Sequence, residues 1–191
     1  MRKSLSEREQ AAIKTKLIES CRMCWERYGY KKTGVAELAS MSGISTGAFY
    51  TFFPSKEMLF IETANAFIKK LYELMATCKP TKPTKYDFAV GFKQCTNEMF
   101  ENKWIFSLRE DSETFLRKLP EDFLEQDFQQ DLIDITAVVK LYGLIPKVSM
   151  EEIVAVFHTL LMSIYLTEII GASHKQALNL LIDSVIDNLF K

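Results

Sequence analysis

The sequence is poor in residues that break helices: its 191 residues include only seven glycines and five prolines. It also has no extended run of alternating β-branched residues bounded by turns, which is the pattern of half-buried strands. Together these absences argue against a β-sheet and predict an all-helical protein. Hydrophobic residues make up 48% of the chain and charged residues 26%, a composition that is typical of globular proteins and excludes disorder.

The signatures of several functional classes are also missing. The chain has no glycine-rich phosphate loop, no H-E-x-x-H pair and no nucleophile elbow, and it holds only two histidines. We therefore expect no enzymatic activity and no cofactor. The charged N-terminus lacks the apolar core of a signal peptide, and we find no stretch of about 18 apolar residues, so we expect a cytoplasmic protein without a membrane partner.

Four cysteines raise the question of a metal or redox site. Cys21 and Cys24 have C-x-x-C spacing, but they fall at positions i and i+3 of an expected helix, and Cys78 and Cys95 do not supply a second such pair. We interpret all four as small apolar residues in a reducing compartment and predict no metal site. Zinc binding or redox sensing by Cys21 and Cys24 is the alternative.

Charge is distributed unevenly along the chain, although the net charge is only -1. Residues 1–56 hold ten Lys and Arg against five Asp and Glu, whereas the rest of the chain holds fourteen against twenty. A basic first third followed by an acidic remainder indicates that only the first third meets a polyanion.

Capping signals and apolar periodicity predict where the helices lie. A first helix begins at Ser6, with Glu9 at capping-box spacing, and ends at Gly29. A second begins at Thr33, and two more follow at about 45–52 and 55–77, before a Lys-Pro-rich linker at 79–83. The further helices are expected at about 86–102, from Ser107 (with Glu110 in a capping box), from Pro120 to Gly143, at 149–171 and, with Gln176 in a box, at 173–190.

The segment around Gly43 has the residue types that a helix-turn-helix needs. Ala39 is small enough for two helices to cross steeply, and Gly43 permits the unusual dihedral angles of the turn between them. Leu38, Ile44 and Phe49 then form an apolar wedge between the two helices. The residues left facing outward are mainly small hydroxyls, a glycine and a tyrosine, which suit phosphate and base-edge contacts in a major groove.

The run from Thr33 to Phe60 resembles the tetracycline-repressor (TetR) family of bacterial regulators, and the shared pattern spans about a third of the chain. The resemblance implies an all-α fold: an N-terminal three-helix helix-turn-helix domain at 1–56 and a larger helical effector-binding and dimerisation domain at 57–191. It implies double-stranded operator DNA, a small-molecule effector and a second copy of the chain as partners. The residues implied to contact DNA are Thr33, Ser45, Thr46, Gly47, Ala48, Tyr50, Thr51, Phe52 and Lys56.

Two of these positions depart from the family pattern. Thr46 stands where the family often has Lys, and Phe52 stands where it usually has His. The recognition helix therefore carries no cation, so we expect DNA affinity to depend on Lys56 and on a set of flanking cations, and base preference to come from apolar contact with thymine methyls. The flanking cations are Arg2, Lys3, Arg8, Lys31 and Lys32.

The last two predicted helices carry apolar residues on nearly every side, so we expect them to form a four-helix bundle across a twofold axis. The predicted interface residues are Phe157, Leu161, Ile164, Leu178, Ile182 and Val185. The middle of the chain is rich in aromatic residues, as is typical of apolar ligand sites. The predicted effector contacts are Phe92, Trp104, Tyr142, His158 and Tyr165.

The function predicted from the sequence is a dimeric, ligand-responsive transcriptional regulator, by family default a repressor, which a small molecule releases from a pseudo-palindromic operator. One alternative is an all-helical carrier or enzyme that does not bind DNA. Another is a DNA-binding protein without an effector, although such a protein would need basic charge over most of its surface.

Overall fold

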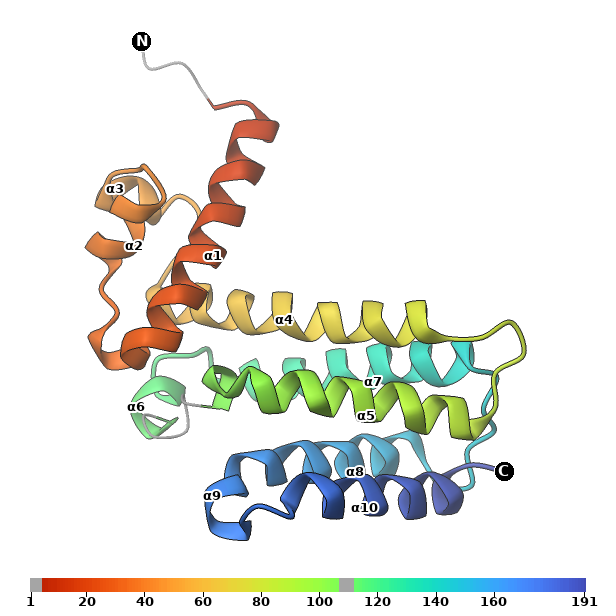
Figure 1. Ribbon diagram of the computed structural model, residues 1–191. Coiled ribbons are helices and arrows are strands. Elements are labelled where there is room, and N and C mark those ends of the chain that lie inside the picture. Colours follow the sequence, from red (N-terminus) through yellow and green to blue (C-terminus); the bar gives the residue numbers. More distant parts are fainter. Residues whose placement is uncertain (1–4, 107–111) are drawn as a thin grey trace. The chain divides into compact units, whose positions relative to one another are not determined.

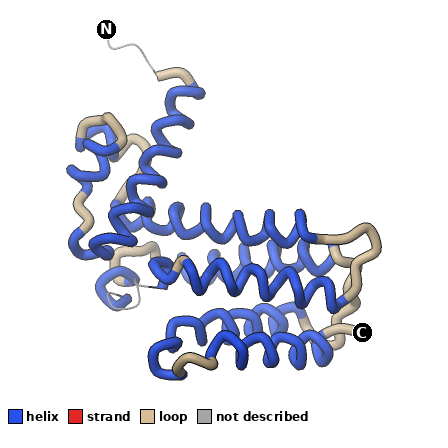
Figure 2. Tube along the Cα trace, in the orientation of Figure 1, coloured by secondary structure: helices blue, strands red, loops and turns tan. Residues whose placement is uncertain are grey.

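The computed structural model describes residues 5–106 and 112–191, in which helices are the only regular elements besides turns (Figures 1 and 2). The one strand-like pairing among these residues is an isolated bridge between Pro146 and Phe190. The predicted all-α fold is thus confirmed. By its internal contacts the chain divides into two compact units. We call Met1–Ile68 with Trp104–Pro120 the headpiece, and Lys69–Lys103 with Glu121–Lys191 the body.

Helix α1 (Glu7–Lys32) begins where the sequence predicts, because Ser6 and Glu9 form a complete capping box. Gly29 does not end the helix as predicted. It adopts a φ of 73°, which favours glycine, and so bends the chain, but the hydrogen-bonded turns resume as far as Lys32. The kink places the last turn of α1, with Tyr30, against the start of α4 (Lys56–Cys78), where Tyr30 is hydrogen bonded to Glu57.

Helices α2 (Val35–Met41) and α3 (Thr46–Phe49) are shorter than predicted and lie beside α1 (Figure 1). Thr33 does not cap α2: that cap is Gly34, which has no side chain to offer, and Thr33 instead closes the end of α1. After Phe49 the chain continues as hydrogen-bonded turns to Phe53 in place of a regular helix.

The headpiece core is formed by side chains from α1, α2, α3 and α4 together with the segment after residue 103. Its buried members are Leu17, Cys21, Cys24, Trp25, Tyr30, Leu38, Ala39, Phe49, Phe53, Leu59, Phe60, Trp104 and Phe115. The chain's two tryptophans, Trp25 and Trp104, contact each other with ring centroids 4.8 Å apart. Their fluorescence therefore reports on this core.

The body contains the rest of α4 and the helices that follow. Their bounds are Lys85–Glu101 for α5, Phe123–Leu141 for α7, Met150–Ser163 for α8, Thr167–Ile170 for α9 and His174–Leu189 for α10. Helix α6 (Ser112–Leu116) belongs to the headpiece, and the capping box predicted at Ser107 and Glu110 lies outside the described residues.

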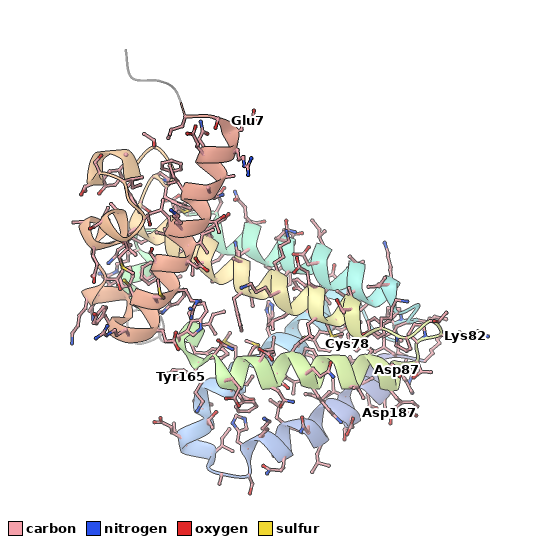
Figure 3. All side chains as sticks on the ribbon, turned by 45° about the horizontal axis from the view of Figure 1, so that its top comes forward. Glu7, Cys78, Lys82, Asp87, Tyr165 and Asp187 are labelled. Carbon is pink, nitrogen blue, oxygen red and sulfur yellow. The ribbon has the colours of Figure 1, made fainter. Side chains whose placement is uncertain are left out.

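Helices α5 and α10 pack against each other along most of their length. Two ion pairs join them, Lys85–Asp187 at 2.9 Å and Lys93–Asp183 at 2.5 Å. Asp87, which completes a capping box at the start of α5, and Asp187 are labelled at the same end of this pair of helices (Figure 3). Packing and charge thus hold the two helices side by side.

The sequence predicts one helix over residues 149–171, and the structure corrects this. Helix α8 gives way to a 3-10 turn, Ile164–Leu166, before α9, and Gly171 ends α9 with a φ of 94°. Buried His174 stabilises this corner, because its two ring nitrogens lie 3.2 Å from Ser163 Oγ and 3.1 Å from Thr167 Oγ1. The capping box predicted at the start of α10 is also absent, since Ser173 makes no side-chain capping bond.

The expectation that the chain lacks a long apolar stretch is wrong for one stretch, Met150–Ile170. Over 18 of its residues the mean hydropathy is 1.9, and only 28% of that window is buried within the chain. Length and composition alone are weak evidence for a membrane span. The 3-10 turn inside the stretch interrupts the regular helix that a span would use.

Candidate nucleic-acid interface

The turn between α2 and α3 is held by backbone geometry that the sequence predicts. Gly43 has a φ of 74°, a left-handed conformation that L side chains rarely adopt. The amide of Ile44 donates to the Ala39 carbonyl at 3.0 Å, and the amide of Gly43 donates to the Ser40 carbonyl at 3.1 Å. These bonds occupy carbonyls at the end of α2 and direct the chain into α3.

The predicted wedge between the two helices is present. Leu38, Ala39 and Phe49 are each exposed by 1% or less, and Ile44 packs partly buried against the same core. Ser45 caps α3 by accepting a hydrogen bond from the Ala48 amide at 3.1 Å. The outward face of α3 is therefore presented by a well-packed support.

The structure places most of the predicted DNA-contacting residues on that outward face. Ala48 and Phe52 are half-buried, and Phe52 packs against the headpiece core. Tyr50 is 55% exposed, and its ring stands edge-on to Phe49 at 5.3 Å, so the buried residue orients the exposed one. The exposed members are Ser45, Thr46, Gly47, Tyr50 and Thr51. Their contact with DNA stays a prediction.

Thr33 lies apart from this exposed face. It is 1% exposed, and its hydroxyl donates to the Gly29 carbonyl at 2.8 Å. Phosphate oxygens accept hydrogen bonds, so a phosphate contact by this hydroxyl requires it to leave Gly29. The predicted phosphate contact of Thr33 is therefore the one that the local geometry supports least.

Lys56 has a structural role that the sequence did not reveal. Its ammonium donates to the Tyr30 carbonyl at 2.9 Å and to the Thr33 carbonyl at 3.1 Å, and it lies 3.9 Å from the centre of the Tyr30 ring. It therefore ties the end of α1 to the start of α4. The side chain is half-buried, so its charge still reaches the surface.

We expect Lys56→Ala to act in two ways. If Lys56 contacts a phosphate as predicted, the slope of log K against log salt concentration should fall by about one unit. The loss of two bonds to carbonyl groups should also lower the melting temperature, which calorimetry measures. Lys140→Ala, an exposed change on α7, serves as the control and should alter neither value. An unchanged salt slope for Lys56→Ala would remove this residue from the interface.

Cations flank the recognition helix in the described headpiece. Arg8, Lys31 and Lys32 are exposed. Lys31 and Lys32 make the end of α1 basic, whereas Arg8 lies between Glu7 and Glu9 at its start. Arg2 and Lys3 lie outside the described residues. Because α3 itself has no Lys or Arg, the prediction that DNA affinity depends on cations outside α3 stands as a prediction.

The cysteine thiols of the headpiece are unsuited to redox or metal chemistry. Burial raises the pKa of Cys21 to about 12, and burial also raises the pKa of Cys24. A thiol with a raised pKa is a poor nucleophile and a poor ligand. Among the described residues no group of three or more His, Cys, Asp or Glu side chains is arranged to hold a metal ion.

The five residues predicted to contact an effector are divided between the two units. Trp104 belongs to the headpiece core, while the other four belong to the body. Within the body, Tyr142 is buried and donates a hydrogen bond to the Met75 carbonyl at 2.8 Å. Tyr142 follows α7, and its ring lies edge-on to Phe88 of α5 with ring centroids 5.3 Å apart. Tyr165 is labelled at the end of the body opposite to Asp187 (Figure 3). Phe92 is buried against Phe157 with ring centroids 4.7 Å apart.

His158, the other predicted effector contact, is partnered within the body. Its Nε2 lies 2.9 Å from Asp131 Oδ2, across the packed helices α7 and α8. The hydrogen bond to Asp131 is the main cause that raises the pKa of His158, against an opposing effect of burial, with Asp127 adding to the rise.

This pair predicts a pH-dependent contribution to stability. A histidine whose pKa is raised by folding stabilises the folded state fully below its unfolded pKa of about 6.5, and this stabilisation is lost as the pH rises through the folded value. His158→Gln should therefore lower the melting temperature more at pH ~5.5 than at pH ~8.5. Thermal unfolding followed by circular dichroism at the two pH values tests this. An equal loss at both would show that the imidazolium form of His158 adds nothing to the stability of the body.

The predicted dimer residues need correction, because most of them fill the core of the single chain. Phe157, Ile164, Leu178 and Ile182 are each exposed by 3% or less, so they are unavailable to a second copy. The apolar residues that α8, α9, α10 and the intervening turn do expose are Met162, Tyr165, Leu166, Ile169, Ile170, Leu180 and Leu181. Periodicity predicted correctly where the apolar helices lie. It did not predict which faces of these helices are buried within the single chain.

Comparison with known proteins agrees with the helix-turn-helix. Residues 17–63 match the family described as bacterial regulatory proteins, tetR family. The chain is 33% identical over 72 residues to the HTH-type transcriptional repressor AcnR of Corynebacterium jeikeium strain K411. That alignment covers 38% of this chain and only 38% of the length of AcnR.

Solved structures share the fold over nearly the whole chain. Thermus thermophilus FadR, a TetR family transcriptional repressor solved with lauroyl-CoA, has a TM-score of 0.68 at 14% identity, over 92% of this chain and 94% of that one. RolR, solved with resorcinol, has a TM-score of 0.62 at 16% identity, over 94% of this chain and 90% of that one.

The buried wedge residues support α3 so that one of its faces is exposed, and a helical body follows in the sequence. These features define a helix-turn-helix protein with a second, helical domain. The match of residues 17–63 and the repressor relative narrow the family of this part of the chain, and the solved structures share its fold. Residues 17–63 form a domain of the tetR family of bacterial regulatory proteins.

Proposed function

We propose that the chain is a cytoplasmic transcriptional regulator, acting as a repressor, that binds a pseudo-palindromic operator as a dimer and is released by a small-molecule effector. In this proposal the exposed face of α3 enters the major groove. The observation that carries it is the exposed set from Ser45 to Thr51, backed by residues that are almost fully buried.

Operator binding is supported by the character of the exposed set and by the relatives. Hydroxyl groups and the bare backbone of Gly47 allow close approach to phosphates and base edges, and the flanking cations supply attraction to the DNA backbone. A repressor is among the relatives, and the tetR family match over residues 17–63 includes this part of the chain. Accordingly we propose residues 1–56 as the DNA-binding region and the remainder as the effector-binding and dimerisation region.

Effector binding is supported by two of the structural neighbours, which were solved with lauroyl-CoA and with resorcinol. A ligand that binds only the folded protein raises its melting temperature, by an amount that grows with ligand concentration. A thermal-shift screen of acyl-CoA thioesters and of phenols therefore tests this part of the proposal. If no compound of either class shifts the transition, neither class contains the effector.

Dimerisation is supported by the unburied apolar surface of the last helices. The stretch Met150–Ile170 is strongly hydrophobic, yet little of it is covered within one chain. Exposed apolar surface of this extent marks an interaction site in a protein that has no membrane around it. A twofold dimer would present two copies of α3 to two half-sites.

Tyr50→Ala tests the operator contact directly. We expect affinity for an operator duplex selected by the wild-type protein from random sequences to fall roughly 5- to 150-fold, as for the loss of about 1–3 kcal/mol of base readout. Fluorescence anisotropy measures the affinity. Tyr28→Ala, at an exposed tyrosine of α1, is the matched control and should bind nearly as the wild type does. A wild-type protein that selects no preferred duplex would overturn the proposed function.

A further inference from the structure

Lys118 belongs to a segment that completes the headpiece from far along the sequence. The segment Trp104–Pro120 has its contacts in the headpiece, although α5 and α7 on either side of it belong to the body. Trp104 packs on Trp25, and Phe115 lies edge-on to Tyr30 with ring centroids 5.2 Å apart. The core that supports α2 and α3 is therefore not built from the N-terminal residues alone.

The same segment brings a cation to a buried carboxylate. Glu57, in the first turn of α4, is only 6% exposed. Its Oε1 accepts a hydrogen bond from the Tyr30 hydroxyl and a second, at 3.2 Å, from Lys118 Nζ. Lys118 Nζ also donates to the Tyr30 hydroxyl at 3.1 Å, which closes a ring of three groups.

The charges in this ring stabilise one another. Burial alone would raise the pKa of Glu57, but the hydrogen bonds from Tyr30 and Lys118 outweigh it and hold that pKa below its ordinary value. Hydrogen bonds to Tyr30 and Glu57 raise the pKa of Lys118. Glu57 therefore stays ionised in a place where an unpaired carboxylate would be strongly unfavourable.

Tyr30 connects this ring to the predicted DNA contacts. The Lys56 ammonium lies over the face of the Tyr30 ring, and it also binds the carbonyl groups of Tyr30 and Thr33. Thr33 is followed at once by Gly34, the cap of α2. Hence Tyr30 has Lys118 at its hydroxyl and Lys56 on its ring, and its position sets where Lys56 and the start of α2 lie.

We propose that Lys118 is a positioning residue for DNA binding. It acts through Glu57 and Tyr30 and holds Lys56 and the start of α2 in the arrangement that meets the operator. Lys118 does not itself contact DNA. This inference rests on the proposed function. It assigns a role in operator affinity to Lys118, which lies far from the helix-turn-helix in the sequence.

The test compares Lys118→Met with Lys118→Arg and with the double variant Glu57→Gln, Lys118→Met. Each is titrated by fluorescence anisotropy against the duplex selected by the wild-type protein, between about 50 and 200 mM salt. Circular dichroism and tryptophan fluorescence verify that each variant is folded with Trp25 and Trp104 in contact. Lys140→Met, an exposed cation of the body, controls for the loss of one positive charge.

We expect Lys118→Met to weaken binding roughly 2- to 30-fold. In a Lys56→Ala background Lys118→Met should lower the salt slope no further, because Lys118 acts through Lys56 and makes no phosphate contact of its own. Lys118→Arg should retain near wild-type affinity. The double variant should recover part of the loss, since the neutral amide introduced by Glu57→Gln leaves no buried charge without a partner. Circular dichroism and tryptophan fluorescence separate this effect from simple destabilisation, because a protein that binds weakly through loss of folding would show a reduced folded signal.

Three results would overturn the inference while the proposed function stands: unchanged affinity of Lys118→Met, a double variant as weak as the single one, or a salt slope that Lys118→Met lowers by about one further unit in the Lys56→Ala background. The last result would make Lys118 a direct phosphate contact. A wild-type protein that binds no preferred duplex would overturn the proposed function and this inference with it.

Discussion

Phe49→Ala is expected to lower the free energy of unfolding by about 3–5 kcal/mol and to abolish operator binding. Phe49 is fully buried where α2 and α3 meet. The centroid of its ring lies 5.3 Å from that of Tyr50 and 6.2 Å from that of Phe53. Truncation leaves a cavity between two helices of seven and four residues, which are too short to be stable without packing. In this variant Tyr50 also loses the Phe49 ring against which its own ring packs.

Denaturant unfolding followed by tryptophan fluorescence measures this effect, because both tryptophans lie in the headpiece core. Phe49→Leu keeps much of the volume and should cost considerably less. Tyr50→Ala provides the converse control, since it should weaken binding and leave the free energy of unfolding nearly unchanged. A Phe49→Ala protein with normal stability and affinity would show that the wedge does not hold α3 in place.

Leu180→Asp is expected to convert the proposed dimer into folded monomers with much lower operator affinity. Leu180 is 70% exposed on α10, beside Leu181 at 53%, and together with the exposed residues of α8 and α9 it offers the apolar surface for a second copy. A carboxylate in that contact would be desolvated without a partner in both copies. A monomer can hold only one half-site at a time, so the operator loses the benefit of linked binding.

Ile164→Asp is the informative comparison, because Ile164 is 1% exposed within the single chain. It should unfold the body and not merely dissociate the dimer, since the charge is buried in the core of its own subunit. Sedimentation velocity and circular dichroism together separate the two outcomes. If Leu180→Asp still sediments as a dimer at micromolar concentration, the interface lies on another face.

Local signals in the sequence were sufficient for the beginnings of several helices. The capping boxes at Ser6–Glu9 and Ser149–Glu152 are present as predicted, because a cap depends only on residues within one turn. The signals failed where a residue had another partner available. Thr33 bonds back to Gly29 and not forward to α2, and the box expected at Ser173 and Gln176 does not form.

The helix-turn-helix was predictable for the same reason. Ala39, Gly43 and Phe49 act within about ten residues of one another, and steric size and backbone dihedral preference are properties of each residue alone. Exposure of Tyr50 then follows from the burial of Phe49 beside it. No comparable short-range pattern marks an effector site, and the residues predicted for it stay a prediction.

The sequence by itself determined that this chain is all-helical, where its recognition helix begins, and which face of that helix points outward, because each of these depends on neighbours along the chain. Only the tertiary structure decided which apolar faces of α8 and α10 are covered by the same chain, and that Lys118 neutralises a carboxylate beside Tyr30, 88 residues away in sequence. Periodicity shows that a helix face is buried but does not show what buries it, and an ion pair between distant segments leaves no spacing to recognise.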